Sequence, residues 1–305
     1  MEFKFLSKDE LSQNFDKFCA LYSSCFTAKI DEKIIKQKFF DNPYEELLIC
    51  VAIDDGNYVA SHSAMPSVVM IDKKPHKTAI FVHAMTHPEY EGRGLFVKLA
   101  NMTLENMSQK GYSFAYSFPN NASNPICCAK LNGIDVCEFP TLQLKINPEV
   151  EVEPVSVLST DDWSNLKEED TDLIHILKEE KYISWRYKNH ITNDYKIVKI
   201  SDDVWFVYNI YGSEINITEY HYADNADNIK LIVNYLYNVA KEKNLEKITT
   251  WCKLNTKAHL MFERCGFLNS APIRYFNIVN LTYDEKTDIT DPRNWNIFMG
   301  DDNVY

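Results

Sequence analysis

Glycine is scarce in this sequence, at 8 of 305 residues, where average composition is about 7%. Long apolar runs are missing as well: no stretch approaches the ~20 residues of a membrane-spanning helix. The eight cysteines form no CxxC pair, so we expect free thiols rather than a disulfide scaffold or a zinc site, and no metal. The first residues lack the apolar run of a signal peptide, which predicts a cytoplasmic protein.

Positive charge is also in deficit. Lysine and arginine total 32 against 44 acidic residues, a formal charge of −12. Such a surface repels phosphate backbones and anionic membranes unless a basic patch is present. We therefore expect neither a nucleic-acid nor a membrane partner. Hydrophobic residues make up 45% of a chain long enough for two domains, each with a core of its own.

Apolar periodicity predicts alternating strands and helices along the whole chain. Residues 147–157 hold two prolines and three glutamates, as linkers often do. The expected organisation is a domain over 1–146, this linker, and a domain over 158–305. The main predicted strands are 47–53, 58–71, 78–86, 112–118, 139–146, 204–210, 214–220, 248–252 and 275–281, and the main predicted helices lie within 9–40 and at 95–110, 126–131, 229–239 and 258–264.

Two of the rare glycines, Gly92 and Gly94, stand within three positions, between a predicted strand and an amphipathic helix. Glycine allows positive φ and a close approach of the backbone. The amides of such a loop, with a helix N-terminus behind them, form an anion site that suits a pyrophosphate. Arg93 adds a positive charge. The alternative is an ordinary strand-to-helix turn, since short glycine motifs have low specificity.

The context of this loop resembles the acetyl-CoA loop of the GNAT acetyltransferase superfamily. The matching run is Thr86-His87-Pro88-Glu89-Tyr90-Glu91-Gly92-Arg93-Gly94-Leu95-Phe96. Asn120 after the next strand and the helix that ends at Gly133 match the later part of the same fold. The resemblance implies an α+β fold of two tandem GNAT-like domains, each with a mixed, mostly antiparallel sheet flanked by helices. It also implies acetyl-CoA as co-substrate.

The resemblance further implies which residues bind the coenzyme. The end of the strand before the loop should splay from its neighbour, so that its backbone binds pantetheine and polarises the acetyl carbonyl. Asn120 would hydrogen-bond the pantetheine, although an Asx turn is its alternative role. The implied coenzyme residues are Ala84, Met85, Thr86, Glu91, Gly92, Arg93, Gly94, Leu95, Phe96 and Asn120.

Three positions depart from the family pattern. Glu91 stands where arginine or glutamine is usual, and Phe96 where a small residue is usual. The family's acid tyrosine would fall at Ala129, or at Cys128 in a shifted register. The backbone amides still suit a pyrophosphate provided that the Glu91 carboxylate points away from it.

The second half resembles a degenerate GNAT domain. In each half, a strand is followed by an asparagine, a short helix and a glycine, and the two series are offset by 133–135 residues. This repeat is a modest sign of duplication. The loop before its main helix, 222–228, has no glycine and two aspartates, so it should repel a pyrophosphate. We expect one coenzyme site per chain.

Direct acetyl transfer needs a base for the ammonium substrate and an acid for the departing thiolate. The base candidate is His83, whose alternative is a structural strand histidine; Glu138 or a water chain could replace it. The acid candidates are Tyr116 and Cys128, although packing in the core is the favoured interpretation of both residues. The run Trp185-Arg186-Tyr187 favours packing with a stacked guanidinium over a substrate clamp.

The sequence thus predicts an acetyltransferase that acts on a primary amine of a small molecule, with amino sugars, including nucleotide-linked ones, as a plausible class. The first alternative is a catalytically inactive acyl-CoA-binding or scaffold protein. The second is an aminoacyl transferase that uses charged tRNA, which the acidic composition disfavours. The acceptor, the acyl length and the oligomeric state are left open.

Overall fold

The computed structural model describes residues 1–26, 31–44, 46–166, 172–223 and 225–304. Within these ranges, no helix has the length and apolarity needed to span a bilayer, and no group of three His, Cys, Asp or Glu side chains is placed to hold a metal ion.

The chain forms two compact units that are interleaved in sequence. Unit 1 comprises Met1–Val136, Asp172–Leu177 and Phe276–Asn294, and unit 2 comprises Cys137–Thr171, Lys178–Tyr275 and Trp295–Tyr305. The sequence predicts contiguous domains instead, and the expected linker at 147–157 lies wholly inside unit 2. The difference arises because two long strands and the C-terminal segment each change unit part-way along the chain.

Unit 1 is built on an antiparallel sheet with one parallel pair. Its strand order is β1-β2-β3-β4-β5-β13, and only β4 and β5 run parallel. The strands are β1 (Glu2–Phe5), β2 (Leu48–Asp54), β3 (Asn57–Ile71), β4 (Lys74–Thr86), β5 (Phe114–Ser117), the short β8 (His175–Ile176) paired with β3, and the end of β13 (Leu268–Asn280). The helices are α1 (Lys8–Gln13), α2 (Phe15–Cys25), α3 (Glu32–Phe40), α4 (Leu95–Gln109) and α5 (Asn124–Leu131).

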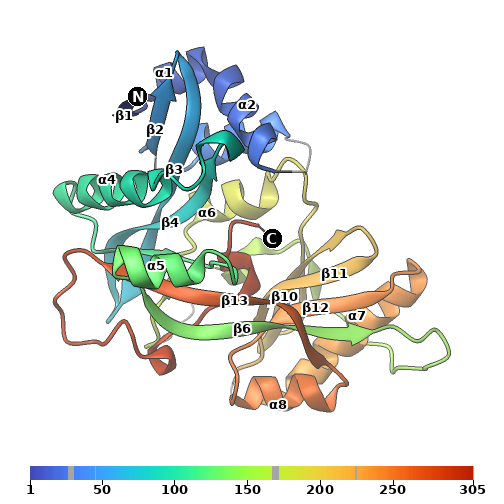
Figure 1. Cartoon of the computed structure of the whole chain (residues 1–305). Helices are drawn as coiled ribbons and strands as arrows, with labels where there is room; N and C mark the ends of the chain where they lie inside the picture. The colour runs from blue at the N-terminus through green and yellow to red at the C-terminus, as the bar shows by residue number, and fades with distance from the viewer. Residues whose placement is uncertain (27–30, 45, 167–171, 224, 305) are drawn as a thin grey trace. The chain divides into compact units, whose positions relative to one another are not determined.

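Both faces of this sheet are covered. Successive β2 residues point to opposite faces, and Leu48 through Ala52 are all buried. Leu48, Cys50 and Ala52 face the core shared with α4, and Figure 1 shows α4 on one side of β2–β4 with α2 on the other. The first helix begins after Ser7, whose side chain forms a capping box with Glu10.

Unit 2 repeats this plan. Its strand order is β13-β6-β12-β11-β10-β9-β7, with β11 and β12 as the parallel pair. The strands are β6 (Ile134–Lys145), β7 (Ser159–Thr160), β9 (Lys196–Ser201), β10 (Val204–Tyr211), β11 (Glu214–His221) and β12 (Lys247–Trp251), and the helices are α6 (Glu180–Ile183), α7 (Ile229–Glu242) and α8 (Lys257–Arg264). The core lies between α7, α8 and the sheet.

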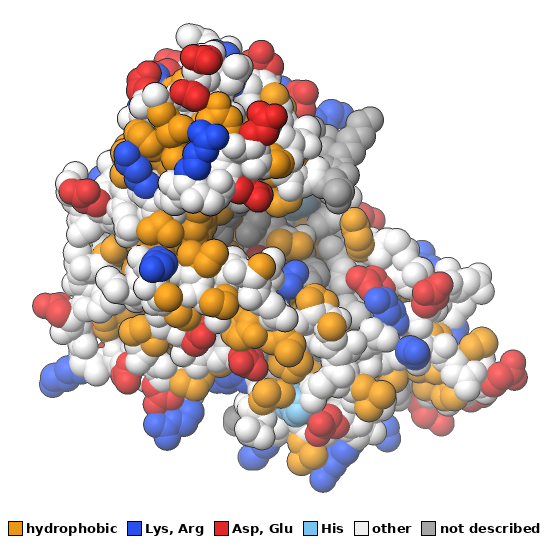
Figure 2. Space-filling model, viewed as in Figure 1, with side chains coloured by type: hydrophobic (Ala, Val, Ile, Leu, Met, Phe, Trp, Pro, Cys, Tyr) orange, Lys and Arg blue, Asp and Glu red, His pale blue; other side chains and the backbone are white. Residues whose placement is uncertain are grey.

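Most expected elements are present with bounds that shift by a few residues. The sequence reasoning missed β9, which has no strict alternation, and placed the start of β13 too late because Pro272 interrupts its pattern. β3 continues without a break through Pro66. Residues 27–30 of the expected first helical region lie outside the described residues. Figure 2 shows acidic and basic side chains interspersed over the face in view.

Candidate active site

The parallel pair of unit 1 separates part-way along β4. The ladder with β5 runs from Thr78 to Ile80 and stops there, while β4 continues to Thr86 against β3 alone. The register with β3 shifts between Ser61 and Ser63, and His83 at the shift has φ +47°. The two features form a β-bulge that turns the end of β4 away from β5. We call the space between the separated strand ends the fork of unit 1.

The glycine loop follows the fork directly. Gly92 and Gly94 both adopt φ +73°, a conformation that side chains rarely tolerate, and a Cβ at either would meet nothing within 4 Å. Gly94 is the N-cap of the 15-residue α4 and provides no side-chain cap. The first amides of α4 therefore lack a capping side chain, and open space lies in front of the loop. This combination suits an anion.

Side chains around the loop point in different directions. Leu95 is buried in the core with Leu99, and the Phe96 ring packs on that of His62, 5.9 Å away. These two residues can reach a coenzyme through their backbone amides only. Glu91 is exposed. Arg93 is exposed as well, donates to the Glu89 carbonyl at 3.0 Å and stacks over the Tyr90 ring.

Asn120 begins the turn that precedes α5. Its Oδ1 accepts hydrogen bonds from the amides of Ala122 and Ser123, the Asx turn that the sequence also allowed. Only the Nδ2 amide of Asn120 could then donate to a coenzyme. At the end of β4, Ala84 is exposed, Met85 is buried, and the Thr86 carbonyl accepts from the Cys25 thiol at 3.2 Å.

His83 occupies an aromatic niche. Its ring lies 5.8 Å from that of Tyr22 and 5.9 Å from that of Phe39. Its Nε2 atom is buried, with no hydrogen-bond partner among the residues described. Burial, helped by the nearby Lys38 charge, lowers the pKa of His83 to about 3, so the imidazole is neutral but weakly basic at pH 7. This environment disfavours His83 as the general base.

Cys128 belongs to a polar cluster that the sequence did not reveal. Asn277 of β13 donates to the Cys128 thiol at 3.3 Å and to the Asp135 carboxylate at 3.1 Å, and Asn124 donates to the same carboxylate at 2.9 Å. Burial, with a contribution from the Asp135 charge, raises the pKa of Cys128. Asn277 lies 149 residues from Cys128, so no local pattern could have linked them.

Tyr116 lies in the core of unit 1. Its side chain is buried, and its ring packs 6.3 Å from Phe118 and 6.2 Å from Phe276. This is the packing role that the alternation of aromatic residues on β5 also indicated.

Residues 9–126 match the family model of the GNAT acetyltransferase domain. This segment is a GNAT acetyltransferase domain. It contains the fork, the glycine loop, α4 and the start of α5. A domain of this family implies acyl transfer from acetyl-CoA to an amine.

Solved structures of the GNAT fold resemble nearly the whole chain. A conserved protein of Enterococcus faecalis, described as a probable N-acyltransferase, has a TM-score of 0.64 at 15% identity over 92% of this chain and 72% of its own. A GCN5-related N-acetyltransferase of Kribbella flavida has a TM-score of 0.63 at 12% identity over 92% and 72%. A putative acetyltransferase of Pyrococcus horikoshii has a TM-score of 0.62 at 10% identity over 98% and 93%. No curated protein sequence matches.

These likenesses establish the fold of the second half too, since they extend over more than nine-tenths of the chain. The predicted α+β fold of the GNAT type is thus confirmed.

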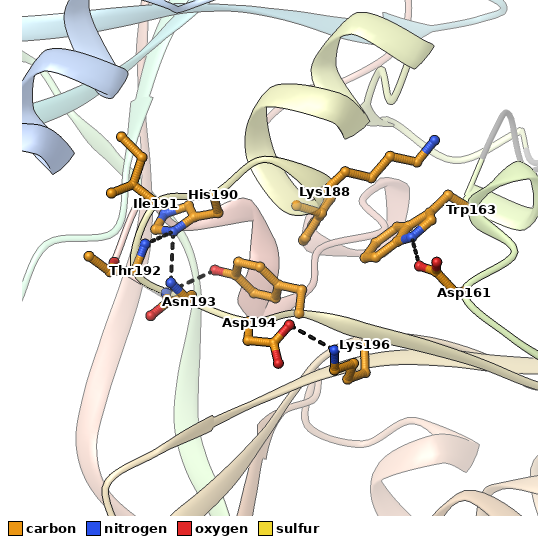
Figure 3. Close-up of a pocket in the computed structure, with 11 residues that line it drawn as sticks. Asp161, Trp163, Lys188, His190, Ile191, Thr192, Asn193, Asp194 and Lys196 are labelled. Carbon is orange, nitrogen blue, oxygen red and sulfur yellow. Dashed lines mark hydrogen bonds and ion pairs between the residues drawn. The ribbon is translucent and has the colours of Figure 1, made fainter.

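Unit 2 contains a separate cavity of about 580 Å³, lined by residues 187–196 except 189 together with Asp161 and Trp163. Some of its polar groups bond to one another, as Figure 3 shows: Asp194 pairs with Lys196 at 2.8 Å, and Trp163 donates to Asp161 at 2.6 Å. His190 Nδ1 accepts from the Asn193 amide at 3.1 Å. These contacts stabilise the loop itself.

Proposed function

We propose that unit 1 transfers the acetyl group of acetyl-CoA to a primary amine of a small molecule. The supporting observation is the fork of β4 and β5 that leads into two left-handed glycines and an uncapped helix N-terminus. The pyrophosphate would lie on the amides of residues 92–96, with Arg93 as a further donor. The pantetheine arm would lie along Ala84, Met85 and Thr86, with the Asn120 amide near it.

The amine nitrogen would attack the thioester carbonyl carbon directly. The C–N bond forms, the C–S bond breaks, the thiolate leaves and the amine loses a proton. A β4 backbone amide would polarise the carbonyl oxygen. We assign the proton-donor role to Cys128, because a raised pKa keeps its thiol protonated at neutral pH. Since His83 is a weak base here, we assign the proton-acceptor role to a water molecule. His83 and Tyr116 are the two side chains whose part in proton transfer should be compared with that of the water.

Amino sugars, including nucleotide-linked ones, are the first acceptor class to test, followed by polyamines and peptide amines. The experiment is a thiol-release assay with acetyl-CoA over a panel of these amines, together with calorimetric titration of acetyl-CoA. Binding of one acetyl-CoA with amine-dependent thiol release supports the proposal. No binding at all refutes the coenzyme assignment.

The alternative is a protein that binds acyl-CoA without turnover. Two observations favour it: the weak basicity of His83 and the absence of a tyrosine at positions 128 and 129. Tight binding without thiol release from any amine would support this alternative. Replacing Cys128 with alanine sharpens the choice, because loss of a general acid costs roughly 10²-fold in turnover, while binding should persist.

A further inference from the structure

The parallel pair of unit 2 forms a fork of its own. The ladder between β11 and β12 ends at Ile217 and Thr250, although β11 continues to His221. Against β10, Tyr208 pairs with Ile217 and Val207 with Glu219, so Thr218 is an extra residue at a bulge. Unit 1 has the same sequence of features, a parallel ladder that stops just before a bulge. The groove that receives pantetheine in the proposed function therefore has a counterpart in unit 2.

The C-terminal segment, residues 295–302, touches both sides of this second fork. On the β12 side, the Trp295 carbonyl accepts a hydrogen bond from the Lys253 ammonium at 2.6 Å. On the β11 side, Gly300 lies so close that a Cβ atom there would be 3.0 Å from the Thr218 carbonyl oxygen and 2.7 Å from Glu219 Oε1. The segment thus bridges the two strand ends.

Phe298 inserts an aromatic side chain between these contacts. Its ring lies 5.1 Å from that of Tyr220 on β11, and it belongs to the core cluster of unit 2. An apolar anchor of this kind excludes water from the groove, and a peptide held this way is not a loose tail.

Buried charges hold the segment in place. The Arg186 guanidinium donates to the Gly300 carbonyl at 3.0 Å and to the Asp302 carbonyl at 2.9 Å. Lys178 pairs with Asp301 at 3.3 Å and with Glu219 at 2.6 Å. Buried charges are costly unless they are paired, so displacing the segment would leave Arg186 and Lys178 short of partners.

We propose that the fork of unit 2 is a peptide-binding groove filled by the chain's own C-terminal segment in place of a pantetheine arm. The groove takes a short 3-10 turn, Met299–Asp301, with Gly300 at the closest approach and the aromatic anchor Phe298 two residues before it. Its equivalence to a pantetheine groove rests on the proposed function, whereas its occupation by the segment does not.

The test compares two enlargements in the full chain. Gly300→Leu places a side chain against Thr218 and Glu219, while Val304→Leu adds one carbon to a side chain that is 61% exposed. Hydrogen exchange is followed by mass spectrometry in peptides covering 218–221 and 299–302. We expect slow exchange of both peptides in the wild type and in Val304→Leu, and at least tenfold faster exchange of 299–302 in Gly300→Leu, while the β10 ladder keeps 218–221 slow. Acetyl-CoA binding should be the same in all three.

Fast exchange of 299–302 in the wild type would overturn the proposal whatever the variants do. So would a Gly300→Leu protein in which 299–302 stays as protected as in the wild type. Because Gly300→Leu is a severe change, Phe298→Ala provides a milder variant with the same expectation. If the wild type does not bind acetyl-CoA, the proposed function is refuted. The exchange result then still tests whether the C-terminal segment occupies the fork of unit 2.

Discussion

The two units contain the same strand arrangement and use it differently. In unit 1 the fork of β4 and β5 leads into a loop with two left-handed glycines and an uncapped helix. In unit 2 the fork of β11 and β12 is bridged by the C-terminal segment, and the loop before α7 has no glycine. Asp227 lies where unit 1 offers open amides. A shared backbone plan therefore does not determine a shared ligand; the loop chemistry and the occupant of the fork do.

The comparison also extends to one arginine from each unit. Arg93 in unit 1 is exposed, whereas Arg186 in unit 2 is buried and bonded to two backbone carbonyls of the C-terminal segment and to the Tyr195 hydroxyl. The first is free to meet a ligand and the second is part of the core. Exposure rather than residue type separates the two roles.

The largest expected effect comes from removing the buried charge. Arg186→Met should lower the free energy of unfolding by about 3–5 kcal/mol, because three buried acceptors lose their donor. Arg93→Met, the control in unit 1, should change it by no more than about 0.5 kcal/mol. Urea unfolding followed by circular dichroism measures both. If Arg186→Met lowers the free energy of unfolding by less than about 1 kcal/mol, the buried Arg186 does not hold the C-terminal segment as described.

The second effect concerns the coenzyme. Gly94→Trp should weaken acetyl-CoA binding by about 100-fold, or about 2.7 kcal/mol, because a side chain at φ +73° is strained and blocks the loop. Asn228→Trp, at the corresponding position before α7 in unit 2, should leave binding unchanged. Calorimetry with acetyl-CoA should give one site per chain. Two sites would remove the distinction between the units.

The third effect is a pH dependence confined to unit 2. Burial raises the pKa of Glu219 to about 7, with Asp301 adding to the shift and Lys178 and Tyr187 opposing it. The folded state holds the Glu219 proton more tightly than the unfolded state, in which the carboxyl pKa is near 4.5. The resulting stabilisation is fully present below pH 4.5 and is lost as the pH rises through 7. Between pH 5 and 8, the wild type should therefore lose about 2–3 kcal/mol relative to Glu219→Gln.

The comparison with Glu219→Gln is needed because buried histidines act in the opposite direction. His62 and His83 both have their pKa lowered to about 3 by burial, so their contributions are present above pH 6.5 and fall as the pH is lowered. These cancel in the difference between the two proteins. A difference that does not change with pH would show that Glu219 is ionised throughout.

The smallest expected effect is that of His83 on catalysis. With its pKa near 3, the imidazole does not change charge between pH 5 and 9, and His83→Phe preserves the aromatic packing. We expect kcat/KM to change by less than about tenfold and its pH profile to keep its shape. A fall of 10³-fold or more would instead make His83 the base.

Local sequence was informative where the chemistry is local. The glycine pair, the strand before it and the helix after it were predictable, since positive φ and a helix start depend on neighbouring residues. Cys128 and Tyr116 could be named as candidates, but their surroundings could not. Asn277 reaches both Cys128 and Asp135 from β13, contacts that only the folded sheet brings together.

The sequence by itself determined the α+β class, the glycine loop before α4 and the lack of such a loop before α7, because each depends on residues next to one another. The tertiary structure alone decided that the compact units interleave, that His83 is buried among aromatic rings and that the last residues occupy the fork of unit 2. Those outcomes depend on burial and on contacts between distant segments. The free energy of such contacts comes from desolvation and packing, which no local pattern encodes.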